Sequence, residues 1–331
     1  MIAKRLNSCG WSGRSGERSR PAAGAPVKTG WRGYPNCLKL TNRSSEVILA
    51  PEAGGRVLVF SREGRNILYQ DRSVDGLTWQ EGGKSFHADG GRFDVGPAWL
   101  IPPHLNLWLG PWSGTVTGPR SARLVSLYDP ATGLQLIRDF ELDASESRLI
   151  IRQTMLNRSD RTIRWCYWGR TLADGAGCCV VPLNPESRFP RGFCMYGPGP
   201  YRLDYRPEGL RNIEVRDGFL IFTGGPEIPQ YGFDTRAGWL AFLNHGLLFV
   251  TRFPVYPERV YNEAGGFSAE VYYFQDRFCE LEPVGPQEVL APGASARFTE
   301  EWWLFACPPP GPAFDPVELA GFVERNTEKV C

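Results

Sequence analysis

Two glutamates in the last quarter of the chain have the spacing of acid–base groups on a β-sheet. Glu280 and Glu282 stand two residues apart in a run that we expect to form a strand. Alternate residues of a strand point to the same face, so both carboxyl groups leave one face of a sheet. Such a pair is suited to general acid–base chemistry on the floor of a cleft. The alternative is a pair of solvated residues on an edge strand.

The residues after this pair predict a turn and a further strand. Pro283, Gly285 and Pro286 favour a turn directly after the glutamates, and the aromatic run Phe298–Phe305 is typical of a strand. We therefore expect the two segments to form a hairpin-like pair of strands.

A second group of polar residues lies in a glycine-rich stretch between Trp79 and Pro97. Glycines let the backbone bring polar side chains close to a ligand or to one another. His87 is one of three histidines in the chain and has carboxylates and an arginine as neighbours, which makes it a candidate catalytic residue. The candidate binding residues of this stretch are Trp79, Lys84, Asp89, Arg92 and Asp94. The alternative is a loop held by its own ion pairs.

Aromatic residues follow closely after this stretch. His104 and Trp108 lie between Trp99 and Trp112. An indole ring stacks on the apolar face of a ligand, while carboxylates and arginines hydrogen-bond to its polar groups. We therefore expect His104 and Trp108 to line the same cleft, although tryptophan is also a common core residue.

The composition predicts an all-β fold. The 331 residues include 38 glycines and 28 prolines, 13% are aromatic, and apolar runs are short. Many short strands separated by turn residues are typical of a sandwich. Helical periodicity is confined to residues 316–330, where we expect a short closing helix. We interpret residues 1–30 as a flexible basic tail and residues 31–331 as a single domain.

Charge and motifs exclude several kinds of partner. A net charge of +1 argues against nucleic acid, and no run approaches the roughly 18 apolar residues of a membrane span. Nine cysteines without a Cys-x-x-Cys pair predict buried reduced thiols and a cytoplasmic protein. No metal-ligand motif and no glycine-rich phosphate loop is present, so we expect no cofactor. The tail lacks the apolar region of a signal peptide; an organelle transit peptide and a start codon placed too early are the alternatives.

Patterns at both ends of the chain resemble aldose 1-epimerase relatives. The resemblance covers roughly residues 38–308, and one part of it is shared with a bacterial branch of the galactose-mutarotase-like superfamily classed only as a domain of unknown function. The matching segments are Leu40–Phe60 at the start, Glu280–Pro286, Leu290–Gly293 and Glu300–Leu304 at the end, and Gly238–Phe242 leading to Phe249–Phe253 for the bacterial branch.

This resemblance implies a galactose-mutarotase-like antiparallel β-supersandwich whose concave face holds a sugar or a sugar acid. In epimerases of the family a glutamate on a late strand is the base toward the anomeric hydroxyl, and Glu280 or Glu282 matches it. His87 lies where the family often places a substrate-binding histidine. Arg56 resembles an arginine that family members point toward the substrate.

The chain departs from the family at the residue that serves as acid. Family epimerases carry a histidine in the middle of the chain, and the matching region Trp165–Asp174 has none. Tyr167, Arg170 and Asp174 are the candidates to replace it, but an arginine stays protonated and would stabilise charge instead of donating a proton. Two functions follow: an epimerase, isomerase or lyase using glutamate as base, or a noncatalytic sugar-binding protein that has lost the acid.

Overall fold

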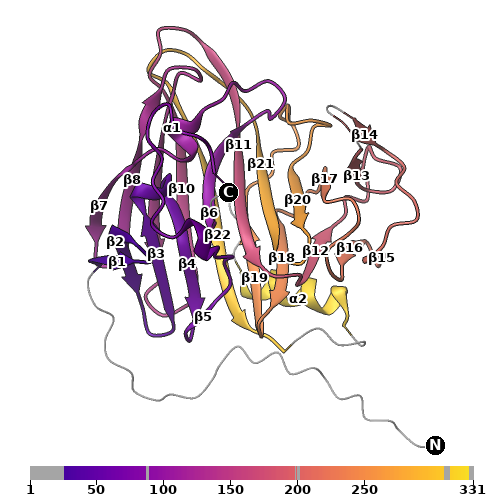
Figure 1. Ribbon diagram of the computed structural model, residues 1–331. Helices are drawn as coiled ribbons and strands as arrows, with labels where there is room; N and C mark the ends of the chain where they lie inside the picture. Colours follow the sequence, from indigo (N-terminus) through magenta and orange to yellow (C-terminus); the bar gives the residue numbers. More distant parts are fainter. Residues whose placement is uncertain (1–25, 87–88, 198, 200–201, 309–313, 328–331) are drawn as a thin grey trace, which may run out of the picture.

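The computed structural model describes residues 26–86, 89–197, 199, 202–308 and 314–327. Over these residues, the chain forms two antiparallel β-sheets that pack face to face around one hydrophobic core (Figure 1). The predicted all-β sandwich is therefore confirmed.

The first sheet has 12 strands in the described residues. Its order is β1 (Val27–Trp31), β2 (Tyr34–Thr41), β3 (Ser45–Ala50), β4 (Arg56–Arg62), β6 (Gly91–Gly96), β11 (Ile163–Asp174), β21 (Phe278–Leu290), β20 (Ala269–Phe274), β17 (Gln230–Phe233), β13 (Cys194–Tyr196) and β14 (Leu203–Asp204), with β5 (Arg65–Asn66) beside β4.

The second sheet has 10 strands in the same part of the chain. Its order is β15 (Ile213–Arg216), β16 (Phe219–Phe222), β12 (Cys178–Pro182), β18 (Trp239–Asn244), β19 (Leu247–Arg252), β22 (Ser295–Ala306), β10 (Arg148–Asn157), β9 (Leu134–Leu142), β8 (Ser121–Asp129) and β7 (Ser113–Gly118).

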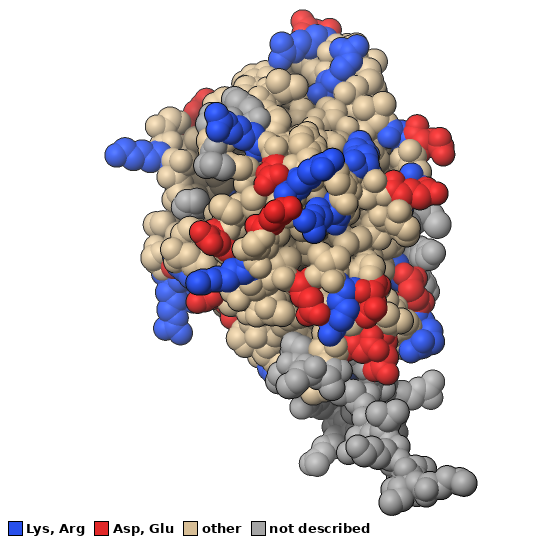
Figure 2. All heavy atoms as spheres, turned by 90° about the vertical axis from the view of Figure 1, so that its right-hand side faces the viewer, with Lys and Arg blue, Asp and Glu red and all other residues tan. Residues whose placement is uncertain are grey.

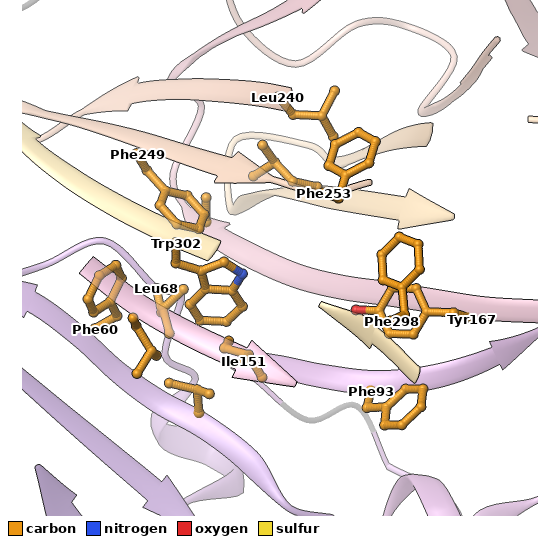
Figure 3. Close-up of a cluster of buried hydrophobic side chains, with 14 of the residues drawn as sticks. Phe60, Leu68, Phe93, Ile151, Tyr167, Leu240, Phe249, Phe253, Phe298 and Trp302 are labelled. Carbon is orange, nitrogen blue, oxygen red and sulfur yellow. The ribbon is translucent and has the colours of Figure 1, made fainter. Parts of the chain in front are cut away.

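The alternation of buried and partly exposed side chains explains why these segments form strands. In β10, every second residue is buried along the whole strand, and Leu149, Ile151 and Met155 belong to the core between the sheets. In β21, Cys279 and Leu281 are core residues, so Glu280 and Glu282 point to the opposite face of the first sheet. Figure 3 shows the aromatic centre of this core, where Trp302 lies near Phe249.

The predicted hairpin at the end of the chain is wrong. β21 runs without a break from Phe278 to Leu290, through the prolines that were expected to form a turn. It pairs with β11 and β20 in the first sheet, whereas β22 pairs with β10 and β19 in the second. A register shift in β11 between Cys166 and Trp168 accompanies the irregular part of β21.

Short helices complete the fold: η1 (Pro51–Ala53), η2 (Arg72–Val74), α1 (Leu105–Trp108) and α2 (Pro316–Asn326). α2 is the expected closing helix. The Asp315 side chain caps it by accepting from the Val317 N–H at 2.8 Å. Leu319 and Phe322 pack with Trp239 against the outer face of the second sheet. None of the helices in the described ranges is long and apolar enough to cross a membrane.

The surface charge and the burial of the cysteines agree with the expectations from the composition. On the face drawn in Figure 2, basic and acidic side chains are interspersed, and neither sign forms a continuous field. Cys166 and Cys279 are buried free thiols, as expected, and Cys307 is buried as well.

Candidate functional site

Four neighbouring strands of the first sheet bring pairs of polar or aromatic side chains onto one face. β6, β11, β21 and β20 lie next to each other at the centre of the sheet (Figure 1). Each contributes two residues at spacing two, which therefore point away from the core. These residues are Arg92 and Asp94 on β6, Trp168 and Arg170 on β11, Glu280 and Glu282 on β21, and Glu270 and Tyr272 on β20.

Arg170 is the centre of this group. Its Nε and Nη2 atoms donate to the two carboxylate oxygens of Glu280 at 2.9 and 3.1 Å, which makes a bidentate ion pair. Nη1 lies 3.7 Å from Asp94 Oδ2, and Nε lies 3.8 Å from Glu282 Oε1. The guanidinium also stacks on the Trp168 ring at 4.7 Å. Three carboxyl groups from two strands thus share one cation.

The two glutamates have different surroundings. Glu280 lines a pocket, whereas Glu282 is fully buried beside it. The Trp168 indole N–H donates to Glu282 Oε2 at 2.8 Å, and Oε1 has no hydrogen-bond partner. Burial and the charge of Glu280 raise the pKa of Glu282 well above its usual value. The protonated form of Glu282 is therefore favoured beside Glu280.

Two more buried carboxyl groups extend this row. Glu270 faces Glu282 directly across the β20–β21 pair and accepts hydrogen bonds from Tyr196 at 3.0 Å and Gln230 at 2.8 Å. Burial and the charge of Glu263 raise the pKa of Glu270 to about 8. Burial also raises the pKa of Glu263 to about 7. The face beside Arg170 therefore holds protonated carboxyl groups at mildly acidic pH.

His104 forms an ion pair with Asp94. One ring nitrogen lies 2.7 Å from Asp94 Oδ1, and the other lies 2.8 Å from the Pro102 carbonyl oxygen. Both partners are acceptors, which suits the doubly protonated ring. Burial lowers the pKa of His104, but the charge and hydrogen bond of Asp94 outweigh it and raise the pKa overall. His104 holds Asp94 in place and has no ring nitrogen left for a ligand.

A pocket of about 530 Å³ opens beside Arg170 and Glu280. Arg92 and Trp108 form one wall, with the Arg92 guanidinium stacked 4.5 Å above the indole ring. Burial and the nearby Arg170 lower the pKa of Arg92 to about 10, so it remains a cation at neutral pH. The complete lining is Tyr69, Asp71, Ser73, Val74, Arg92, Trp108, Arg170, Leu172, Tyr272, Phe274, Arg277, Phe278 and Glu280.

The outer end of this pocket has its own ion pair. Arg277 Nη2 donates to Asp71 Oδ2 at 2.6 Å and also to the Tyr69 hydroxyl. Hydrogen bonds from the side chain and backbone of Ser73, together with Arg277, hold the pKa of Asp71 at about 2. Asp71 is therefore ionised at all ordinary pH values.

Several predicted site residues lie away from the pocket lining. Arg56 is fully buried and donates to the Trp108 carbonyl oxygen at 3.2 Å, so it supports a wall from behind. Trp79 is buried and donates to the Gly83 carbonyl oxygen. Lys84 is exposed. Asp89 is buried and accepts from the Asp71 N–H at 3.0 Å. His87 lies outside the described residues.

The other candidates for the missing acid also point elsewhere. Tyr167 faces the core and donates to Glu300, behind the pocket. Asp174 lies at the end of β11, where it accepts from His245 in the turn between β18 and β19. Of the three candidates for the acid, only Arg170 lines the pocket.

Trp112, one of the tryptophans near His104 in the sequence, packs in the core.

The prediction overlooked several residues on this face. Glu270 and Tyr272 stand two residues apart on β20, as Glu280 and Glu282 do on β21. The argument from alternating strand residues therefore applies to them as well. Tyr69 and Asp71 carry no such signal, because their position depends on where the loop after β5 returns to the sheet. In the described ranges, no group of three or more His, Cys, Asp or Glu side chains is arranged to hold a metal ion.

The two-sheet architecture is that of galactose mutarotase-like proteins. Such a protein from Lactobacillus casei ATCC 334 superimposes with a TM-score of 0.55 at 9% identity, over 81% of this chain and 100% of the other. Another from Clostridium acetobutylicum gives a TM-score of 0.51 at 11% identity, over 82% and 95%. A protein from Synechocystis sp. PCC 6803 gives 0.55 at 12% identity, over 87% and 100%.

The chain therefore has the galactose-mutarotase-like fold that its end patterns predict. No model of a protein family matches the sequence, and a comparison with curated proteins also gave no match. At this level of identity the likeness establishes the fold, and function must be argued from the site.

Proposed function

We propose that the protein binds a sugar in the pocket beside Arg170 and that Glu280 acts on it as a general base. The observation that carries this proposal is the ion pair of Arg170 and Glu280 on the wall of a pocket that also contains Trp108 and Tyr272. The guanidinium donates to sugar hydroxyls, the carboxylate accepts from them, and the aromatic rings stack on C–H faces.

The environments of the two glutamates assign their roles. A base must reach the ligand, and Glu280 lines the pocket, where it is paired with Arg170. Glu282 is fully buried, and its raised pKa favours the protonated form, so it does not compete for the ligand's proton. A buried carboxyl group with a raised pKa beside a second carboxyl group is typical of acid–base sites.

Tyr272 is the hydroxyl donor that this geometry favours in place of the histidine. It lines the pocket and is the direct cross-strand partner of Glu280. Burial and the charge of Glu280 raise the pKa of Tyr272, so the phenol keeps its proton and can donate to a ring oxygen.

The reaction that fits these groups is interconversion of sugar anomers. Glu280 takes the proton of the anomeric hydroxyl, the bond between the anomeric carbon and the ring oxygen breaks, and the ring oxygen gains a proton from Tyr272. Rotation of the aldehyde and the reverse steps give the other anomer. Arg170 stabilises the negative charge that develops on oxygen.

Glutamine substitutions test this assignment. We expect Glu280→Gln to lower the anomer exchange rate at least about 100-fold, because an amide cannot accept the proton, while sugar affinity stays within a few-fold. Tyr272→Phe should also slow exchange. NMR exchange spectroscopy on a panel of reducing sugars measures these rates. Glu288→Gln is the matched control, since Glu288 lies on the same strand and pairs with Arg259 outside the pocket. Unchanged exchange in Glu280→Gln would exclude Glu280 as the base.

A noncatalytic sugar-binding protein is the second candidate. The bidentate pairing of Glu280 with Arg170 favours it, because both carboxylate oxygens are occupied by donors. The same NMR panel separates the two functions. Binding without exchange in the unmodified protein supports the second, and binding with exchange that depends on Glu280 supports the first.

A further inference from the structure

We propose that the outer half of the pocket is a second sugar subsite, so that the ligand has at least two linked sugar rings. The outer subsite consists of Tyr69, Asp71, Phe274, Arg277 and Phe278, all of which line the same pocket as Arg170 and Glu280. This inference rests on the proposed function and adds the class of ligand to it.

The two ends of the pocket repeat the same chemistry. At the inner end, Arg170 and Glu280 form an ion pair at 2.9 Å, and at the outer end Arg277 and Asp71 form one at 2.6 Å. Each pair offers guanidinium N–H donors and carboxylate acceptors, which are the partners that vicinal hydroxyls need. A single ring that fills one end leaves the donors and acceptors of the other end without a ligand.

Contacts between aromatic rings link the outer end to Tyr272, the cross-strand partner of Glu280 at the inner end. Phe278 contacts Tyr69 at 5.0 Å, Phe274 at 5.5 Å and Tyr272 at 6.3 Å between ring centroids. Phe274 remains 37% exposed. A cluster of partly exposed aromatic rings that joins two polar ends is not required by the core and marks a binding surface. Its apolar faces match the C–H faces of consecutive pyranose rings.

The size of the pocket agrees with a ligand of this kind. Its volume of about 530 Å³ lies within the range of roughly 300–1,000 Å³ that encloses multi-ring small molecules. The lining of its outer end comes from two sides, the loop after β5 with Tyr69 and Asp71, and the β20–β21 hairpin with Phe274, Arg277 and Phe278. Arg277 of the hairpin donates hydrogen bonds to Asp71 and Tyr69 of the loop, and so joins the two sides at the outer end.

Paired titrations test the second subsite. Isothermal titration calorimetry with glucose and galactose is compared with maltose, cellobiose and lactose on the full-length chain. We expect at least one disaccharide to bind about tenfold more tightly than the monosaccharides, because it gains ring stacking and hydrogen bonds at the outer end. Arg277→Ala and Asp71→Asn should each remove most of that advantage and weaken disaccharides more than monosaccharides.

Arg259→Ala is the matched control, because Arg259 also pairs with a carboxylate and stacks on a tyrosine, but outside the pocket. It should leave the preference for disaccharides unchanged. Equal affinity for one and two rings, or an equal loss of both in Arg277→Ala, overturns the second subsite and leaves the proposed function intact. That outcome would make the Arg277–Asp71 pair a purely structural link. Failure of every sugar to bind contradicts the proposed function itself.

Discussion

Arg170 shows why the polar residues of this face must be considered together. It is paired with Glu280 and lies within 4 Å of carboxyl oxygens of Asp94 and Glu282. Asp94 is also paired with His104 and Arg92, so the cations of this face are shared. Burial, and after it the charge of neighbouring carboxyl groups, raises the pKa values of Glu282 and Glu270.

The raised pKa of Glu270 predicts a pH-dependent stability. The unfolded chain releases this proton near the ordinary pKa of 4.5, whereas the folded protein keeps it up to about 8. Because the folded state binds this proton between these two values, the contribution of Glu270 to stability is fully present below pH 4.5 and is lost as the pH rises to about 8. We expect Glu270→Gln to flatten that fall by an amount on the order of 1 kcal/mol or more.

Urea unfolding at a series of pH values measures this effect. Glu263, Glu282 and Glu300 also have raised pKa values, so the variant should reduce the slope and not abolish it. Glu141→Gln is the control, because Glu141 is an exposed partner of Arg152. A Glu270→Gln protein with the same pH slope as the unmodified chain would contradict the raised pKa.

Residue spacing predicted part of this site and left out the rest. Glu280 was identified from its spacing on an expected strand, Arg92 from the glycine-rich stretch and Arg170 from the region that matches the family's acid, and all three line the pocket. The outer subsite was not predicted, because contacts between the loop after β5 and the β20–β21 turn join residues some two hundred positions apart. Such distant contacts leave no local pattern in one sequence.

At the scale of the elements, the packing of β6 requires Gly91, whose missing side chain leaves room for the Trp302 ring. A Cβ atom on Gly91 would lie 2.4 Å from the ring of Trp302, which is buried in the core. We expect Gly91→Ala to destabilise the fold by about 1–3 kcal/mol. Because Arg92 and Asp94 follow on the same strand, sugar affinity should fall as well.

Urea unfolding of Gly91→Ala checks this expectation. The control is Gly30→Ala on β1, where the nearest atom to the added Cβ is 3.8 Å away. Equal stability of the two variants would show that the packing of β6 against Trp302 is looser than described.

The strands themselves were largely predictable, but their partners were not. Apolar alternation marks β9 and β10 in the sequence, and a continuous apolar run marks β19. The connection between β21 and β22 was misread because proline and glycine favour turns, whereas here Pro283 and Gly285 lie within a buried strand. Tertiary packing overrides local turn preference when both faces of a strand are covered.

At the scale of the whole molecule, the two sheets contribute different parts of the structure. The second sheet and α2 enclose the core from one side, and the first sheet carries the polar face on the other. A polar network joins the two: Glu300 on β22 accepts from Trp302 at 2.8 Å and from Thr251 at 3.1 Å, and it also accepts from Tyr167 on β11. Glycine and proline content with short apolar runs sufficed to predict this architecture.

Saturation-transfer difference NMR tests the central claim that this pocket binds a sugar. Irradiation of the protein's aromatic protons is applied to a panel of monosaccharides and disaccharides. We expect transfer to the C–H protons of at least one sugar, and its loss in both Arg170→Gln and Trp108→Ala, which change different parts of the pocket lining. Absence of transfer to every sugar, or transfer that survives in both variants, would contradict the claim.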